Sequence, residues 1–312
     1  MRAFLTVPLL LASVAGLQAQ TPTPQARVFG YIQPRFQAAG DSAAFSLRRA
    51  RLGVLGALNS WATFRVVAEL RTGGDTAPAT VSMKDAVVIF TTQAARWSAA
   101  VGQFKAPFSR EELQSAAVVE LAERALVVDA LAPGRDVGAM GEWRPGGSAS
   151  LVQVGVFNGE GENRVTNPDG RMLWVARAVY GKGDTRGGMA FGGGVASDPA
   201  GTRWGIEGEW RRGAWLARAE LIALEPASGG SRDHGWYVLG ARKVASDKAQ
   251  IVGRIEALTS GAPAATVNAY TLGGQYFFRN EDLKLQAGYT VFNVMGGASA
   301  ENRFIVQLQL RF

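Results

Sequence analysis

The sequence contains no cysteine and very little histidine, and these absences exclude several kinds of site. Among its 312 residues there is no Cys and one His, His234. Without thiols the chain forms neither disulfide bonds nor a thiolate metal site. One histidine cannot supply a transition-metal cluster, and a Ser-His or His-Asp catalytic site would rest on it alone. We therefore expect no metal, no cofactor, no catalytic residue and no enzymatic activity.

Long apolar runs are missing after the N-terminus. No run of about 18 apolar residues follows residue 20, so transmembrane helices are not expected. The first segment, MRAFLTVPLLLASVAGLQAQ, places Arg2 before an apolar stretch and offers a cleavage site after Ala19, as an export signal does. The alternative is a short apolar helix retained as an anchor. We expect residues 1–19 to be a signal peptide and residues 20–312 to form one domain.

Charge of either sign is sparse. Charged residues make up 19% of the chain, and the net charge of +7 is dispersed along the sequence. A dispersed excess does not form the basic patch that nucleic acid requires, so no nucleic-acid partner is expected. At 47% hydrophobic residues the chain is also too apolar to be disordered.

What the sequence does have is a repeated unit: a segment of alternating polar and apolar residues, followed by turn residues. The last segment, NRFIVQLQLRF, puts Phe304, Val306, Leu308, Leu310 and Phe312 on one face of a strand and Arg303, Ile305, Gln307, Gln309 and Arg311 on the other. Likewise, Arg49 and Arg51 share a face of FSLRRARLGVLGAL, and burying unpaired charge is costly. Lipid would cover the apolar faces and a wet lumen would hold the charged ones, which predicts a transmembrane antiparallel β-barrel.

About sixteen such segments can be counted, an even number as in bacterial outer-membrane barrels. We expect strands to begin near Arg27, Phe45, Ala62, Val81, Trp97, Arg135, Ala149, Gly170, Gly187, Thr202, Ala214, Gly235, Ala249, Thr266, Leu283 and Asn302. Short and long connections alternate, and five tryptophans flank the short ones, as expected for an aromatic belt at the periplasmic rim: Trp61, Trp97, Trp143, Trp210 and Trp215.

One connection, residues 106–134, is far longer than a hairpin loop and too apolar for water. Folding back into the barrel would bury its apolar residues and narrow the pore. It follows the fifth strand, so it is the third external loop. The later loop NGEGENRVTNPDG has oxygen ligands for Ca²⁺ but not the spacing of a calcium loop, and we interpret it as an ordinary loop.

Four motifs, FSLRRARLGVLG, VGQFKAPFSREEL, ERALVVDALAPGRDVG and GVFNGEG, occur in this order. Together they resemble the phosphate-selective porin O/P family of the bacterial outer membrane. The resemblance implies a sixteen-stranded barrel that forms homotrimers, an infolded third loop, outer-membrane lipid as the surroundings, and assembly machinery that reads the terminal Phe312. It also implies basic residues along the pore, and the matching positions here are Arg49, Arg51, Lys105, Arg110, Arg124 and Arg135.

Acidic residues oppose these cations. The long loop carries Glu111, Glu112, Glu120, Glu123 and Asp129. Inward arginines can equally serve as ion-pair partners between strands. We expect Glu207 to face Arg218, and Glu69 to pair with Arg49 or Arg51. Lys105 and Arg110, at the root of the loop, are the cations expected to touch solute.

The leading functional hypothesis is therefore a channel for passive diffusion of small hydrophilic solutes, preferring anions such as phosphate or polyphosphate because guanidinium groups match their oxygens. A general diffusion or sugar porin is the second hypothesis. A surface scaffold or barrel enzyme is a distant third, because a scaffold needs no constriction.

Overall fold

The computed structural model describes residues 26–71, 79–145, 150–181, 188–261, 265–295 and 301–312. They form sixteen strands and two short helices, α1 (Arg110–Leu113) and α2 (Leu126–Leu131). The strands are β1 (Ala26–Ala39), β2 (Ser42–Ala57), β3 (Ala62–Arg71), β4 (Thr80–Thr91), β5 (Trp97–Lys105), β6 (Arg135–Trp143), β7 (Leu151–Phe157), β8 (Leu173–Gly181), β9 (Gly188–Asp198), β10 (Gly201–Arg212), β11 (Trp215–Pro226), β12 (Asp233–Val244), β13 (Ala249–Ser260), β14 (Ala265–Arg279), β15 (Leu283–Met295) and β16 (Arg303–Arg311). The expected signal peptide, residues 1–19, lies outside the described residues and stays a prediction.

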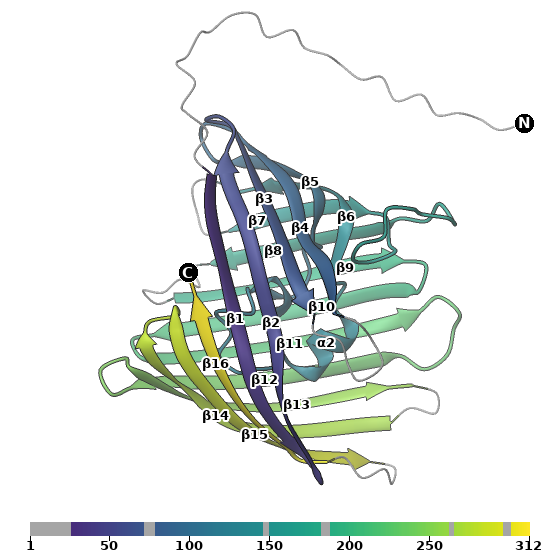
Figure 1. Ribbon diagram of the computed structural model, residues 1–312. Coiled ribbons are helices and arrows are strands. Elements are labelled where there is room, and N and C mark those ends of the chain that lie inside the picture. Colours follow the sequence, from purple (N-terminus) through teal and green to yellow (C-terminus); the bar gives the residue numbers. More distant parts are fainter. Residues whose placement is uncertain (1–25, 72–78, 146–149, 182–187, 262–264, 296–300) are drawn as a thin grey trace, which may run out of the picture.

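Each strand pairs with its sequence neighbours, and β1 pairs with β16, so the sheet closes into an antiparallel barrel (Figure 1). The closure extends to the last residue. Gly30 and Phe312 exchange two backbone hydrogen bonds, each 3.0 Å long. The expected sixteen-stranded barrel is confirmed, and every strand begins within three residues of its expected position.

The two faces of the strands follow the alternation expected from the sequence. In β16, Phe304 and Leu308 are exposed on the outside, while Gln307 and Gln309 are buried inside. Neither helix in the described ranges is long enough to cross a membrane. Apolar residues therefore cover the outer surface and polar residues line the lumen, as an outer-membrane barrel requires.

Two of the three register shifts in the described strands are β-bulges that turn extra cations inward. Pro34 has no N–H to give to the ladder, and the register between β1 and β2 shifts at this point, leaving Arg48 as the additional residue. Between β3 and β4 the additional residue is Lys84. Arg48 therefore reaches Glu123 in the lumen, next to Arg49, instead of pointing outward as strict alternation would place it.

Aromatic side chains gather at the rim formed by the short turns. Trp97 stacks on Trp143 with ring centroids 5.6 Å apart, and Trp61 stacks on Phe90 at 5.7 Å. Trp210 and Trp215 flank the turn between β10 and β11 and are exposed. This arrangement is the expected interfacial belt.

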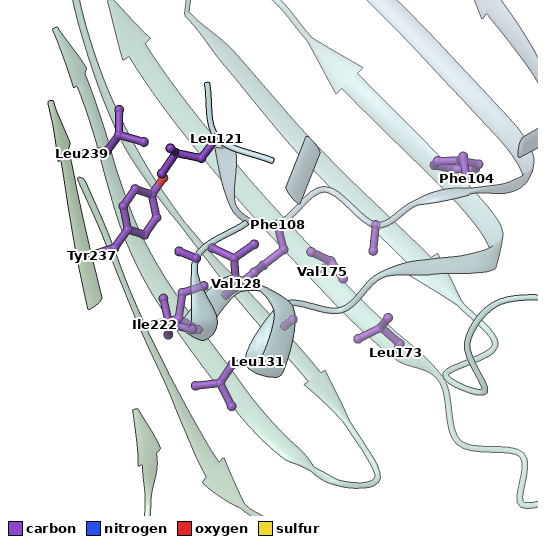
Figure 2. Close-up of a cluster of buried hydrophobic side chains, with 14 of the residues drawn as sticks. Phe104, Phe108, Leu121, Val128, Leu131, Leu173, Val175, Ile222, Tyr237 and Leu239 are labelled. Atoms are coloured by element: carbon purple, nitrogen blue, oxygen red, sulfur yellow. The ribbon is translucent and has the colours of Figure 1, made fainter. Parts of the chain in front are cut away.

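The long connection, which we call loop L3 (residues 106–134), folds into the barrel and forms the buried apolar core with the inner wall (Figure 2). Phe108, Val127, Val128 and Leu131 are almost fully buried. Glycines in the wall leave room for them: a Cβ at Gly205 would lie 3.2 Å from Phe108, and one at Gly235 would lie 2.9 Å from Val127. The infolded third loop is thus confirmed.

Candidate functional site: the constricted lumen

Glutamine side chains of the barrel wall hold the backbone of loop L3 at its middle. Gln33 on β1 donates to the carbonyl of Ala116 at 3.2 Å, and Gln309 on β16 donates to that of Ala117 at 3.0 Å. Gln286 on β15 donates to the carbonyl of Val119 at 3.1 Å. These three glutamines are buried inside the barrel, so the loop crosses the lumen as far as the closing strands.

Wall carboxylates bind the start of each short helix. Glu220 on β11 accepts from the backbone N–H groups of Arg110 and Glu111, at 3.1 and 2.7 Å. Glu256 on β13 accepts from the N–H of Leu126 at 2.6 Å. These carboxylates satisfy helix-start donors that would otherwise lack partners. They are anchors for the loop.

A buried ion-pair network fixes the same region. Arg218, whose side chain is fully buried, lies 2.8 Å from Glu120 of loop L3 and 2.7 Å from Glu209 of β10. The expectation that Glu207 faces Arg218 is wrong: Arg218 pairs with Glu209, and Glu207 lies opposite Glu220. The turn at Gly213 sets this register, and counting from the sequence misplaced it by two residues.

Among the carboxyl groups of loop L3 that have shifted pKa values, Glu111 and Glu123 shift in opposite directions. Burial raises the pKa of Glu111 to about 7, although Arg254 and the N–H of Ala125 act in the opposite direction. Burial would also raise the pKa of Glu123, but Arg35 and Arg48 outweigh it and hold the pKa at about 2. Glu123 is therefore a permanent anion of the constriction, whereas Glu111 changes charge near neutral pH.

One space left beside loop L3 is a cavity of about 420 Å³ against the wall of β1–β7. Its charged lining residues are Arg51, Arg65, Lys105, Arg135 and Asp85. Each cation has a carboxylate nearby: Arg51 lies 2.5 Å from Glu69, and Arg135 lies 2.9 Å from Asp85, which also lies 3.2 Å from Arg65. The hydroxyl of Tyr31, on the same lining, is buried and has no hydrogen-bond partner in the described part of the chain.

The structure brings together three of the six basic residues singled out in the sequence, Arg51, Lys105 and Arg135, at this cavity. Lys105 also donates to the carbonyls of Glu112 and Gln114. Arg49 lies deeper in the wall, where its guanidinium donates to Gln33 at 3.1 Å. Of the two pairings considered for Glu69, Arg51 is the partner.

The other two predicted residues lie elsewhere. Arg110 is directed toward β10, 3.6 Å from Glu209. Arg124 donates to the carbonyls of Glu111 and Gln114, at 3.0 and 2.8 Å, and so holds the fold of loop L3. Both residues are absent from the described lining of the 420 Å³ cavity.

The sequence reasoning missed several lumen residues. Arg48 and Lys84 reach the lumen only because of the bulges. There, Lys84 lies 2.7 Å from Glu162 and 3.2 Å from Glu69. Pro34 in the neighbouring strand was the available signal for Arg48. Arg65 of β3 also lines the cavity and was not singled out from the sequence. Among the described residues, no group of His, Asp and Glu has the arrangement of a metal site.

The sequence and the fold were compared with known proteins. The family model for phosphate-selective porins O and P matches residues 28–187, half of the chain. The chain belongs to this family. As a member of this family, the porin is an outer-membrane channel. No curated protein matches its sequence.

Solved structures of outer-membrane proteins share the porin's fold. The channel DcaP of Acinetobacter baumannii aligns with a TM-score of 0.68 and 12% identity, over 96% of the porin and 100% of that chain. A loop-deletion mutant of the Vibrio cholerae outer membrane protein OmpT gives 0.66 and 14%, over 93% and 100%. A mutant porin of Rh. blastica gives 0.63 and 11%, over 92% and 100%. At these identities the likeness concerns the fold alone.

Proposed function

We propose that the porin conducts small anions by passive diffusion, with a preference for oxyanions such as phosphate or polyphosphate. The observation that carries this proposal is the charge of the cavity lining, in which Arg51, Arg65, Lys105 and Arg135 outnumber the carboxylate of Asp85. Family membership supports it. We assign the barrel to transport and not to catalysis, because a constricted passage is what a channel needs.

Guanidinium groups suit this role because their planar fork matches the oxygens of phosphate. An anion that enters the constriction loses part of its hydration, and Arg51 and Arg135 can replace the lost contacts. The partial pairing with Glu69 and Asp85 keeps binding weak enough for release, which conduction requires.

The test is a planar-bilayer measurement on the double variant Arg51→Gln with Arg135→Gln. In this variant Glu69 still has Lys84 as an ion-pair partner, and Asp85 still has Arg65. Both carboxylates of the wall therefore stay paired. Each lost charge contributes about 1 kcal/mol at about 4 Å in water. We expect the reversal potential in a salt gradient to move toward cations and phosphate to stop blocking the chloride current.

The matched control is Arg232→Gln, which removes one charge from an exposed pair with Glu225 outside the lumen. It should leave selectivity unchanged. If the wild-type channel prefers cations, or phosphate never blocks its chloride current, the oxyanion preference is wrong and a general diffusion or sugar porin takes its place.

We also propose that the porin forms homotrimers. One similar structure, OmpT of Vibrio cholerae folded in vitro, is described as a trimer form. Chemical cross-linking in the outer membrane tests this, and a purely monomeric pattern would contradict it.

A further inference from the structure

Part of the cavity wall is apolar although it faces the lumen. On the periplasmic side of Arg51, Lys105 and Arg135, the cavity lining is mostly apolar. Its apolar residues there are Phe29, Leu55, Val87, Ile89, Ala100 and Met140. Elsewhere on the inner wall, apolar residues such as Ile222 and Leu239 are covered by loop L3 and are almost fully buried (Figure 2). Leu55, in contrast, points into the lumen and is 40% exposed. Val87 and Ala100 belong to the buried core that includes loop L3, and Ile89 and Met140 pack against that core. Packing of loop L3 therefore does not account for the exposed Leu55.

A single accessible cation lies within this apolar wall. Arg65 is directly opposite Leu55 on β2 and Val87 on β4 in the strand register. Its side chain is 44% exposed, whereas those of Arg51, Lys105 and Arg135 are between 11% and 13% exposed. Arg65 lies 3.2 Å from Asp85, but Asp85 receives its hydrogen bond from Arg135 at 2.9 Å. Among the cations that line the cavity, Arg65 is thus the most accessible to a solute.

The surroundings of Arg65 suit an anion that carries a flat apolar group. Leu55 and Val87 lie on either side of Arg65. As in any directly opposed pair, the Cβ atoms are about 5 Å apart. The ring of Phe29 lies over Gly53, where a Cβ would approach it to 2.6 Å, so the ring lies against the wall and leaves the cavity open. The cavity volume of about 420 Å³ is within the range of small-molecule sites.

We propose that Arg65, Leu55, Ile89 and Phe29 form a binding site for organic anions with an apolar body, specifically aromatic carboxylates. The carboxylate pairs with the Arg65 guanidinium, and the ring covers Leu55 and Ile89. This inference rests on the proposed anion conduction and extends it, because inorganic phosphate has no apolar surface to place on this wall.

The experiment measures block of the chloride current by benzoate, acetate and phosphate in planar bilayers. Benzoate and acetate carry the same charged group and differ in apolar area. We expect benzoate to half-block the wild-type channel at about one tenth of the acetate concentration, from the ring area that Leu55 and Ile89 remove from water. Arg65→Gln should weaken block by both carboxylates.

The deciding variant is Leu55→Asn with Ile89→Thr, which makes the wall polar and leaves its charges in place. Benzoate should then block no better than acetate, and block by phosphate should not change. Leu55→Met with Ile89→Val keeps the wall apolar and is the matched control, which should retain the wild-type difference.

The outcomes separate the two proposals. If the wild-type channel prefers anions but benzoate and acetate block equally, the aromatic-carboxylate site is wrong and the proposed function stands. The site is also wrong if the polar double variant keeps the preference for benzoate. A wild-type channel that prefers cations and is blocked by none of the three anions overturns both proposals.

Discussion

At the scale of single residues, carboxylates of this porin perform different tasks that depend on their partners. Glu220 and Glu256 bind helix N–H groups, whereas Glu123 lies between two arginines. Glu111 differs from both, because it is fully buried and its nearest strong cation, Arg254, is 3.9 Å away. Its neighbours on the wall also include Glu220, Arg218 and Tyr237. This setting disfavours the charged form of Glu111.

The first prediction is a pH dependence of loop docking. Because the pKa of Glu111 rises from 4.5 to about 7 in the fold, the docked loop favours the neutral carboxyl. Docking is therefore most stable below the ordinary pKa and weakens as the pH rises through about 7. Current noise in single channels should increase between about pH 5 and about pH 8. Glu111→Gln keeps an acceptor for the N–H of Ala125 and should change this dependence. A variant with the wild-type pH profile would contradict the assignment.

At the scale of elements, loop L3 is held by the shape of the wall as much as by hydrogen bonds. Phe108 lies against Gly194 and Gly205, on adjacent strands β9 and β10, where added Cβ atoms would come within 3.4 and 3.2 Å of its ring. Any larger side chain at these glycines competes with Phe108 for the same space. The glycines thus make a socket for an aromatic ring.

The second prediction concerns this socket. Gly205→Val should displace Phe108 and weaken docking of loop L3 by roughly 3 kcal/mol, the cost of losing a buried phenylalanine contact. Single-channel recordings should then show a higher and less steady conductance. Gly208→Val, on the same strand, is the control, since nothing lies within 4 Å of an added Cβ there. Equal conductance for the two variants would show that the socket does not hold the loop.

The strands and the infolded loop could be predicted from the sequence because both depend on local pattern. Alternating polarity located all sixteen strands, and the apolar composition of residues 106–134 indicated burial. The partners inside the lumen could not be predicted. They depend on strand register, which decided between Glu207 and Glu209 for Arg218, and on bulges, which turned Arg48 and Lys84 inward. Register is a property of pairs of strands, and one segment does not reveal it.

At the scale of the whole molecule, closure of the barrel extends to the last residue of the chain. Phe312 exchanges backbone hydrogen bonds with Gly30, and its ring would meet a Cβ on Gly30 at 2.8 Å. The terminal residue therefore completes the seam between β16 and β1. We propose that the outer-membrane assembly machinery also reads this terminal aromatic residue.

The third prediction is that deletion of Phe312 lowers the amount of assembled barrel severalfold. The assembled fraction is measured in outer membranes from the gel shift between heated and unheated samples. Phe312→Tyr retains the ring and the backbone bonds, so it should assemble like the wild type. If the deletion assembles equally well, neither the seam nor the terminal aromatic residue limits assembly.

The off-centre position of loop L3 has a consequence for how such a channel can change its cargo. Helix α2 of the loop contacts β11–β13, while the open cavity lies against β1–β7. Substitutions at Leu55 or Arg65 therefore change the cavity lining without touching the hydrogen-bonded anchors of the constriction. These cavity positions can diversify while the separate anchors preserve the aperture, so mutations at the two sets of positions should combine additively.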